Sequence, residues 1–264
     1  NLTSNFPSNF FRSTPVLLLF GHCSLREVTQ TVLTSLLSQP YLNSRQSFSG
    51  SGSGSGGVLS LISLTTGNTG FKINKAQLEA AITERTKLFL FSSPCNPSGA
   101  VYSLKELEAL AEVFLRYPDI LIISDEIYEY INFTGAHVSI ASIAALKERV
   151  ILVNGLSKGF AMTGWRLGYI ATNTTVAKAC EKIQGQFTSG ANAIAQRAGI
   201  TALTTDLKPT YAMTEEFTRR RKRVLELVRE IPGLPCFEPE GAFYIFPNVT
   251  YYYGKSYGDL TIKN

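Results

Sequence analysis

Short apolar runs alternate with amphipathic stretches through the middle of the chain, from residue 58 to residue 172. Runs of four to seven apolar residues bounded by turn-forming residues are typical of buried strands, and apolar residues repeating every three or four positions indicate helices. This pattern predicts an α/β fold with a mainly parallel sheet covered by helices on both faces. The predicted strands are 58–64, 87–93, 120–124, 150–154 and 167–171, and the predicted helices are 74–82, 103–117 and 139–147.

Capping residues support two of these helices. Asn74 is a suitable N-cap for the first. Ser103 and Glu106 have the spacing of a capping box, and Pro118 follows the end of the same helix. Helices are predicted to dominate from residue 174 to residue 231, with breaks near Gly190 and Pro209, and a strand is predicted in the stretch "GAFYIFPNV" that follows.

The first 57 residues differ from the rest of the chain. They are rich in Ser, Asn and Thr and end in "SFSGSGSGSGG", which has the composition of a flexible linker. Apart from a short helix across 25–37, we expect little regular structure there. The predicted domains are an atypical, partly disordered segment (1–57), a large α/β domain (58–205) and the start of a small α+β domain that the chain does not finish (206–264).

Composition narrows the functional classes. The formal net charge is +5, and much of it lies in the run "RRRKR" at 219–223. Because that run falls within a helical pattern and no nucleic-acid motif accompanies it, we interpret it as a solvated helix face. The apolar run at 16–20 is too short to span a membrane. Four scattered cysteines and two histidines favour free thiols in a reducing, cytoplasmic compartment over a metal site.

Polar residues follow three of the predicted strands. Asn96 follows the strand at 87–93, Asp125 and Tyr128 follow the strand at 120–124, and Lys158 follows the strand at 150–154. In open α/β sheets, ligands bind beyond the carboxyl ends of the strands, so these side chains are expected to converge on one site.

Each of these residues also has an ordinary structural interpretation. Asn96 could simply belong to a proline-flanked turn, and Asp125 could cap the next helix. Tyr128 could be a half-buried core residue, and Lys158 an exposed loop residue. The functional interpretation therefore depends on their joint occurrence.

A lysine at a strand end can form an imine with a carbonyl group. A carboxylate on the neighbouring strand suits a ring nitrogen that must stay protonated, and pyridoxal phosphate (PLP) carries both an aldehyde and such a nitrogen. Arg166, with its bidentate guanidinium, and Ser157 are suited to the phosphate. Asn96 and Tyr128 can hydrogen-bond the phenolic oxygen of the cofactor.

Three segments, "SSPCNPSGAVYS", "ISDEIYEYINF" and "NGLSKGFAMTGWRLGYI", resemble those of class I/II PLP-dependent aminotransferases of fold type I in order and spacing. The likeness is greatest to bacterial aspartate aminotransferases of the branch that includes aromatic and prephenate transaminases. "EGAFYIFPN" is similar to the strand that enters the small domain in that family. The resemblance covers residues 57 to 247.

The resemblance implies a role for each position. Lys158 would form the imine and move the substrate proton, Asp125 would pair with the pyridinium nitrogen, and Tyr128 and Asn96 would bind the phenolic oxygen. Arg166 would clamp the phosphate, with Ser157 beside it. The family also implies a cis Asn96-Pro97 bond, amino acid and 2-oxo acid substrates, and a homodimer.

The sequence departs from the family at both ends. A Gly-rich phosphate loop and an aromatic stacking segment are expected before residue 57, and the arginine that binds the substrate carboxylate is expected after residue 264. We therefore expect a fragment with an aberrant N-terminus. Two alternatives stay open: a β-lyase or decarboxylase of the same fold, and a PLP-binding fragment without activity.

Overall fold

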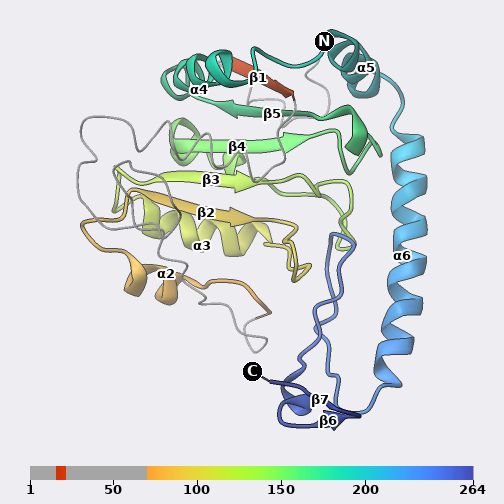
Figure 1. The fold of residues 1–264 in the computed structure, drawn as a ribbon. Helices are drawn as coiled ribbons and strands as arrows, with labels where there is room; N and C mark the ends of the chain where they lie inside the picture. The colour runs from red at the N-terminus through yellow and green to blue at the C-terminus, as the bar shows by residue number, and fades with distance from the viewer. Residues whose placement is uncertain (1–15, 22–69, 264) are drawn as a thin grey trace.

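A computed structural model of the protein describes residues 16–21 and 70–263; of 16–21 it describes the backbone. Five strands form one sheet in the order β1-β5-β4-β3-β2 (Figure 1). Strand β5 pairs antiparallel with both of its neighbours, while β2, β3 and β4 pair in parallel, so β1 to β4 all run in one direction. The predicted mainly parallel sheet is confirmed. The strands are β1 (Val16–Gly21), β2 (Leu88–Ser92), β3 (Leu121–Asp125), β4 (Val150–Gly155) and β5 (Leu167–Thr172).

Strand β4 lies at the centre of the core, and all six of its residues are buried. Its side chains alternate between the two faces of the sheet. Val150 and Leu152 pack on the face that carries α3 (Leu104–Phe114) and, beside it, α2 (Lys75–Ala81). Ile151 and Val153 pack on the opposite face, against α4 (Thr174–Phe187). The two faces are called the α3 face and the α4 face below.

The two faces are not covered equally. Helix α3 packs its buried Leu107, Leu110 and Phe114 against the sheet. Helix α4 lies over β1 and β5, at the other end of the sheet. On β2 the α4-face residue Leu90 is 40% exposed, so among the described residues no helix covers that edge.

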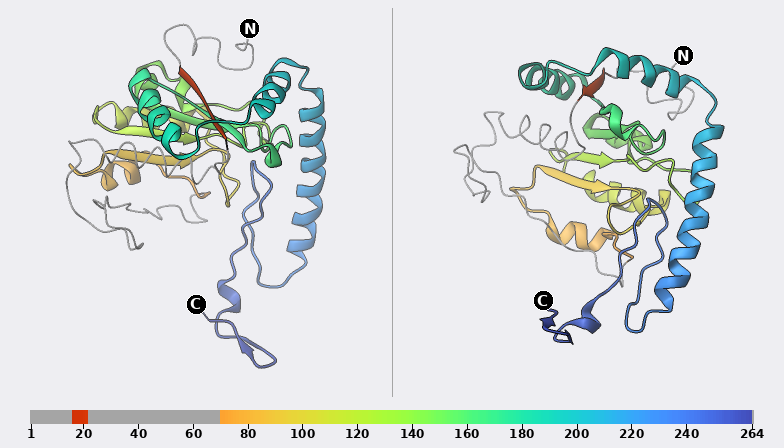
Figure 2. Two further views of the ribbon diagram at one scale, coloured as in Figure 1. Left: turned by 45° about the horizontal axis from the view of Figure 1, so that its top comes forward. Right: turned by 45° about the vertical axis from the view of Figure 1, so that its right-hand side comes forward.

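Helices α5 (Ala193–Thr204) and α6 (Lys208–Arg229) follow α4. Figures 1 and 2 show α6 standing beyond the carboxyl ends of β2, β3 and β4. It is fastened to the loop after β3, because the Thr214 hydroxyl donates to the carbonyl of Tyr130 at 2.7 Å. After α6 the chain returns towards the sheet and then turns away into a small hairpin of β6 (Ser256–Tyr257) and β7 (Leu260–Thr261).

Several local predictions are confirmed. Asn74 caps α2, and the Ser103–Glu106 capping box at α3 is complete. The helical region does break around Gly190 and again before Pro209, which stands in the first turn of α6.

Two element predictions are wrong. The segment predicted as an α-helix at 139–147 forms two 3-10 helices, η2 (Ile140–Ser142) and η3 (Ala144–Arg149), since Ser139 caps only one tight turn before the chain bends at Ile143. The segment "GAFYIFPNV" forms isolated bridges rather than a strand, because Ala242 has a positive φ of 57° and Pro247 lacks an amide donor. The predicted helix at 25–37 and strand at 58–64 lie outside the described residues.

Strand β1 is a further difference, because little regular structure was expected before residue 58. It pairs along its whole length with β5, from Val16 opposite Thr172 to Gly21 opposite Leu167. The apolar run that is too short for a membrane is long enough to form one strand of the sheet.

Candidate functional site

The loops that follow β2, β3 and β4 meet at one edge of the sheet, as predicted (Figure 1). Backbone hydrogen bonds join them beyond the strands themselves. The amide of Ser93 donates to the carbonyl of Asp125 at 3.0 Å, and the amide of Glu126 donates to the carbonyl of Val153 at 2.9 Å. The residue that carries the predicted carboxylate is therefore fixed from both neighbouring strands.

Asp125 is a largely buried acid. It is the last residue of β3, and alternation along the strand puts its side chain on the same side as Ile123, on the α4 face. One carboxylate oxygen accepts a hydrogen bond from the amide of Ile127 at 3.2 Å. Burial, with a smaller contribution from the like charge of Glu126, raises the pKa of Asp125 to about 7. A cationic partner would stabilise the ionised form of this carboxyl group.

Tyr128 lies near Lys158 and is influenced by Asp125. The Nζ atom of Lys158 is 5.8 Å from the ring centre of Tyr128. The charge of Asp125 is among the influences that raise the pKa of Tyr128, although burial is the largest of them. The structure therefore connects three of the predicted residues through Tyr128: the amine lies near its ring, and the charge of the carboxyl group acts on its hydroxyl.

The loop that carries Lys158 is held by close packing at the next residue. A side chain on Gly159 would lie 2.5 Å from the ring of Tyr130, so only glycine allows this approach. The carbonyl of Lys158 accepts a hydrogen bond from the amide of Ala161 at 3.3 Å. The lysine is thereby anchored to the loop after β3, which also carries Tyr128.

Asn96 lies on the same edge of the sheet but at the surface. It is exposed in the turn after β2. The Asn96-Pro97 peptide bond is cis, as the resemblance implied, and the Ser93-Pro94 bond is cis as well. No described contact joins the side chain of Asn96 to Asp125, Tyr128 or Lys158.

Ser157 and Arg166 share the turn between β4 and β5. The hydroxyl of Thr163 donates to the carbonyl of Ser157 at 2.9 Å, and Arg166 donates from Nη1 to the carbonyl of Thr163 at 3.0 Å. Arg166 has a left-handed backbone, with φ of 52°, and its side chain is only partly exposed. No described contact links Ser157 or Arg166 to the Asp125 cluster, but both lie in the loop between β4 and β5 that also carries Lys158.

Two aromatic residues of the returning segment complete the cluster and were not predicted as site residues. The ring of Phe243 is 5.3 Å from Nζ of Lys158. The hydroxyl groups of Tyr244 and Tyr128 are hydrogen-bonded at 2.5 Å. The backbone holds this segment in place, because the amide of Ala242 donates to the carbonyl of Ile131 at 2.7 Å. Their signal was the motif "EGAFYIFPN", which we interpreted only as a strand.

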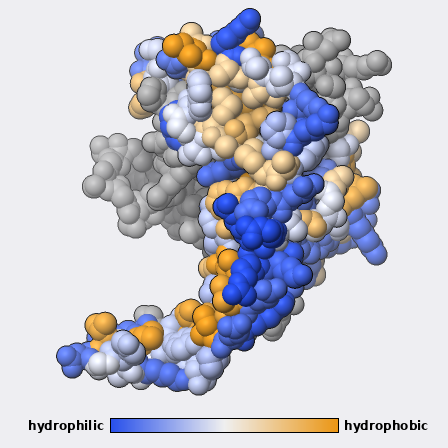
Figure 3. Space-filling view, turned by 90° about the vertical axis from the view of Figure 1, so that its right-hand side faces the viewer, coloured by the Kyte–Doolittle hydropathy of each residue, from blue (hydrophilic) through white to orange (hydrophobic). Residues whose placement is uncertain are grey.

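The basic run on α6 is largely paired. Arg219 and Arg220 both bind Glu216, and Arg221 binds Glu238. Figure 3 shows a hydrophilic band along this helix. The pairing supports our interpretation of the run as a solvated helix face.

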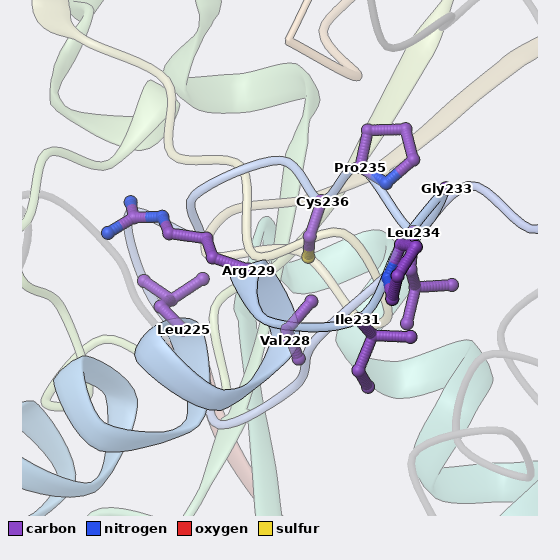
Figure 4. A pocket seen from close by; sticks show the side chains of 9 residues that line it. Leu225, Val228, Arg229, Ile231, Gly233, Leu234, Pro235 and Cys236 are labelled. Atoms are coloured by element: carbon purple, nitrogen blue, oxygen red, sulfur yellow. The ribbon is translucent and has the colours of Figure 1, made fainter.

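A separate hollow lies at the end of α6, away from the strand ends (Figure 4). Its volume is 360 Å³, and its lining is mostly apolar, including Leu225, Val228 and Leu234. It contains none of the predicted site residues. The described residues include neither a His, Cys, Asp or Glu cluster fit for a metal ion nor a helix that could cross a membrane.

Comparison of the chain with known proteins identifies its family. The family described as "Aminotransferase class I and II" matches residues 47–252. The chain belongs to the class I and II aminotransferase family. It is 45% identical over 188 residues to a bifunctional aspartate and glutamate/aspartate-prephenate aminotransferase of Petunia hybrida, covering 70% of this chain and 39% of that protein. It is 46% identical over 180 residues to an aspartate aminotransferase of Bacillus subtilis, covering 67% of this chain and 46% of that protein.

Solved aminotransferase structures show the same fold. The aspartate aminotransferase of Rhizobium meliloti superposes with a TM-score of 0.69 at 41% identity, covering 72% of this chain and 48% of that one. An aspartate aminotransferase of Thermus thermophilus with maleate gives 0.66 at 38% identity, covering 71% and 49%. The predicted fold type I is confirmed. The chain spans about half the length of these relatives, or less.

Class I and II aminotransferases use pyridoxal phosphate. The Asp125 cluster fits this cofactor on its own chemistry. A primary amine lies next to a phenol, and the hydrogen bond described for the buried carboxyl group comes from a backbone amide, with no described cation beside it. A cationic ring nitrogen would supply the missing counter-charge.

Proposed function

We propose that this protein is a PLP-dependent aminotransferase that transfers an amino group between an amino acid and a 2-oxo acid. The observation that supports this most is the grouping of Lys158, Asp125 and Tyr128 at the carboxyl ends of β3 and β4. When bound, the cofactor supplies an electron sink for the carbanion formed at the substrate Cα.

The residues of this chain would act on the cofactor and on protons. Lys158 would hold the cofactor by its amine and, once released, carry the proton removed from the substrate Cα. Asp125 would stay ionised against the ring nitrogen and keep that nitrogen protonated. Tyr128, with Asn96, would donate hydrogen bonds to the phenolic oxygen, and Arg166, with Ser157, would bind the phosphate.

The substrate class follows from the relatives. Those compared here carry the names aspartate aminotransferase and aspartate-prephenate aminotransferase. We propose aspartate as the preferred amino donor, and an aromatic or prephenate-type amino acid as the second choice of donor.

Covalent labelling tests the central assignment. The purified chain is mixed with PLP, reduced with borohydride, digested and mapped by mass spectrometry. Label is expected on Lys158 and is expected to disappear in Lys158→Ala, while the control Lys222→Ala, an exposed lysine on α6, keeps it. Label on other lysines alone, in a sample shown to be folded, would refute the proposal.

Product analysis separates the alternatives. With aspartate and 2-oxoglutarate, an aminotransferase yields glutamate and oxaloacetate, whereas a β-lyase or decarboxylase yields no glutamate. A fragment that binds PLP without turnover would show the label on Lys158 and no product.

We further propose that the protein forms a homodimer, as is typical of the family. Two large apolar side chains support this, because Phe187 is 83% exposed and Ile194 is 73% exposed. A dimer interface would remove these apolar groups from water. Light scattering coupled to gel filtration should give the dimer mass, and Phe187→Ser with Ile194→Ser should shift it towards the monomer.

The proposal includes a domain division and a location. Residues 58–205 would be the PLP-binding domain and 206–264 the start of the small domain, with α6 beginning at the boundary. No disulfide involves the cysteines of the described residues, Cys95, Cys180 and Cys236. Free thiols are usual in a reducing compartment, which supports a cytoplasmic location.

A further inference from the structure

A buried polar cluster lies on the α3 face of the sheet, directly behind Asp125. Its centre is Glu126, which is 2% exposed. One oxygen of its carboxylate accepts hydrogen bonds from the hydroxyls of Ser124 and Ser139, each at 2.7 Å. The other accepts a hydrogen bond from Nε2 of His137, also at 2.7 Å. Three side-chain donors therefore hold this one carboxylate.

The cluster extends from β3 to the strand that precedes Lys158. The amide of Glu129 donates to the carbonyl of Glu126 at 2.9 Å. The side chain of Glu129 is hydrogen-bonded by Asn154, near the end of β4. The side chain of Asn154 is itself fixed, because its Oδ1 atom accepts a hydrogen bond from the amide of Gly155 at 2.7 Å. The chain of contacts thus links the Asp125 loop to the Lys158 loop on the face opposite the site.

Filling a core with such a polar cluster costs free energy. Removing two carboxyl groups and an imidazole from water costs more free energy than burying apolar side chains of the same size. The Nδ1 atom of His137 is also buried without a partner among the described residues. A role in stability alone therefore does not account for these residue types, whereas a role in fixing geometry does.

The geometry of β3 connects Glu126 directly to Asp125. Asp125 and Glu126 are consecutive, so their side chains leave the backbone on opposite sides. The two residues share one peptide group, so the contacts that fix the backbone at Glu126 also fix the backbone from which the Asp125 carboxyl group extends. The backbone amide of Glu126 also donates a hydrogen bond to the carbonyl of Val153 on β4.

We propose that Glu126, held by His137, is a positioning residue that sets the direction of the Asp125 carboxyl group towards the cofactor ring. This inference rests on the proposed function, because Asp125 is taken to meet the ring nitrogen. Glu126 touches neither substrate nor cofactor and acts through Asp125 alone.

The decisive variant is Glu126→Gln, which keeps the shape but removes the charge that holds His137. The control is Glu215→Gln, the same change at an exposed position on α6. Three quantities are measured on each folded chain: the dissociation constant for PLP by absorbance titration, the imidazole titration of His137 by NMR, and the midpoint of thermal unfolding. In Glu126→Gln the dissociation constant should rise about ten-fold, in the range seen when supporting partners of ligand-binding groups are removed. The His137 pKa should fall, because the neighbouring negative charge is lost.

A second variant keeps the test decisive if Glu126→Gln does not fold. His137→Gln retains the carboxylate and its two serine donors, and it should weaken PLP binding by a smaller factor.

The outcomes are separable. If the His137 pKa falls but PLP binds as tightly as in the control, the cluster is purely structural and the inference is overturned. If the parent chain fails to bind PLP through Lys158, the proposed function fails first, and the positioning role fails with it. Weaker PLP binding with little change in the unfolding midpoint supports the inference, because a merely structural role would move the midpoint and leave the affinity unchanged.

Discussion

The sheet and the segment after α6 are built in opposite ways. Every residue of β4 is buried, and most of the core lies within the β2–β5 sheet and the helices packed on it. In the last hairpin, by contrast, Tyr257 is 86% exposed and Leu260 is 74% exposed. The sheet region carries its own hydrophobic core, whereas the segment after α6 is held by contacts with the sheet region and with α6.

That contact is short but it reaches the site. The amides of Glu240 and Gly241 both donate to the carbonyl of Gly99 at 2.8 Å, and the amide of Phe133 donates to the carbonyl of Glu240 at 2.8 Å. Two residues later, Phe243 and Tyr244 contact Lys158 and Tyr128. The difference teaches that the site has a floor from the sheet and a wall from the returning segment, which is attached to the sheet region by backbone hydrogen bonds.

The largest effect on stability is expected in the sheet. Ile151 is fully buried in β4, so Ile151→Ala should lower the free energy of unfolding by about 3 kcal/mol through lost burial and a residual cavity. Urea denaturation measures this. The matched change Ile262→Ala, at a side chain that is 41% exposed, should cost less than about 1 kcal/mol. Equal losses would mean that the two regions share one core.

The next largest effect concerns the floor of the site. Asp125→Ala should slow the reaction of PLP-loaded protein with aspartate at least about 100-fold, because the electrostatic partner of the ring nitrogen is lost. Label on Lys158 should persist. Stopped-flow absorbance measures the reaction, and a variant as fast as its parent would remove Asp125 from the mechanism.

A glycine substitution tests the attachment of the wall. Gly99 has φ of +74°, and a side chain there would lie 2.3 Å from Cβ of Pro239. Gly99→Ala should destabilise the protein by roughly 2 kcal/mol and loosen the returning segment. Hydrogen exchange should rise at the amides of Glu240 and Gly241.

The control for this change is Gly135→Ala. Gly135 also has a positive φ, of 114°, but nothing lies within 4 Å of an added side chain. Exchange at Glu240 and Gly241 should stay at the parent value in this variant. If both variants loosen the segment equally, backbone strain alone explains the effect.

The pH dependence of stability probes the buried acids. Burial raises the pKa of Asp125 from 3.8 to about 7 and that of Glu129 from 4.5 to about 7. The folded chain therefore binds more protons than the unfolded chain in this window, so the free energy of unfolding should fall as the pH rises from about 4 to about 7. The pKa of His137 is raised by Glu126, and its contribution is likewise lost as the pH rises.

Asp125→Asn should flatten this fall, and urea denaturation at several pH values measures it. Addition of PLP should flatten it too, since a cationic ring nitrogen stabilises the ionised carboxylate. An unchanged slope in Asp125→Asn would show that Asp125 titrates normally.

The smallest effect is expected at the aromatic wall. Tyr244→Phe removes the hydrogen bond to Tyr128 and should cost about 1 kcal/mol of unfolding free energy. Tyr257→Phe, at an exposed tyrosine, should cost nothing measurable. Thermal unfolding of the two variants compares them, and a larger loss for Tyr257 would contradict the description of the hairpin as weakly attached.

The sequence predicted the sheet region well because local signals and burial agree there. Ser103 and Glu106 form their capping box, and the apolar run of β4 is central. It failed where tertiary contacts decide. Ala242 takes a positive φ because Gly99 and Ile131 hold the segment by its backbone, which no local pattern reveals.

The site was predictable to a similar degree. Lys158, Asp125 and Tyr128 could be grouped because parallel strands end at one edge. Phe243 and Tyr244 are distant in sequence and reach the site by an irregular segment. The role of Glu126 was hidden for another reason, since a lone acid after a strand has no partner in the sequence until His137 is placed beside it.

Because Asp125 and Glu126 extend to opposite faces of the sheet, the length of β3 determines which of the two acids faces the site. Deleting one residue between Leu121 and Ser124 would shift the strand by one position and exchange the sides on which the two acids emerge. Asp125 would then emerge on the α3 face, and the longer Glu126 would emerge on the α4 face in its place. Single-residue insertions and deletions in β3 should therefore be tolerated less well than conservative substitutions, which keep each side chain on its face.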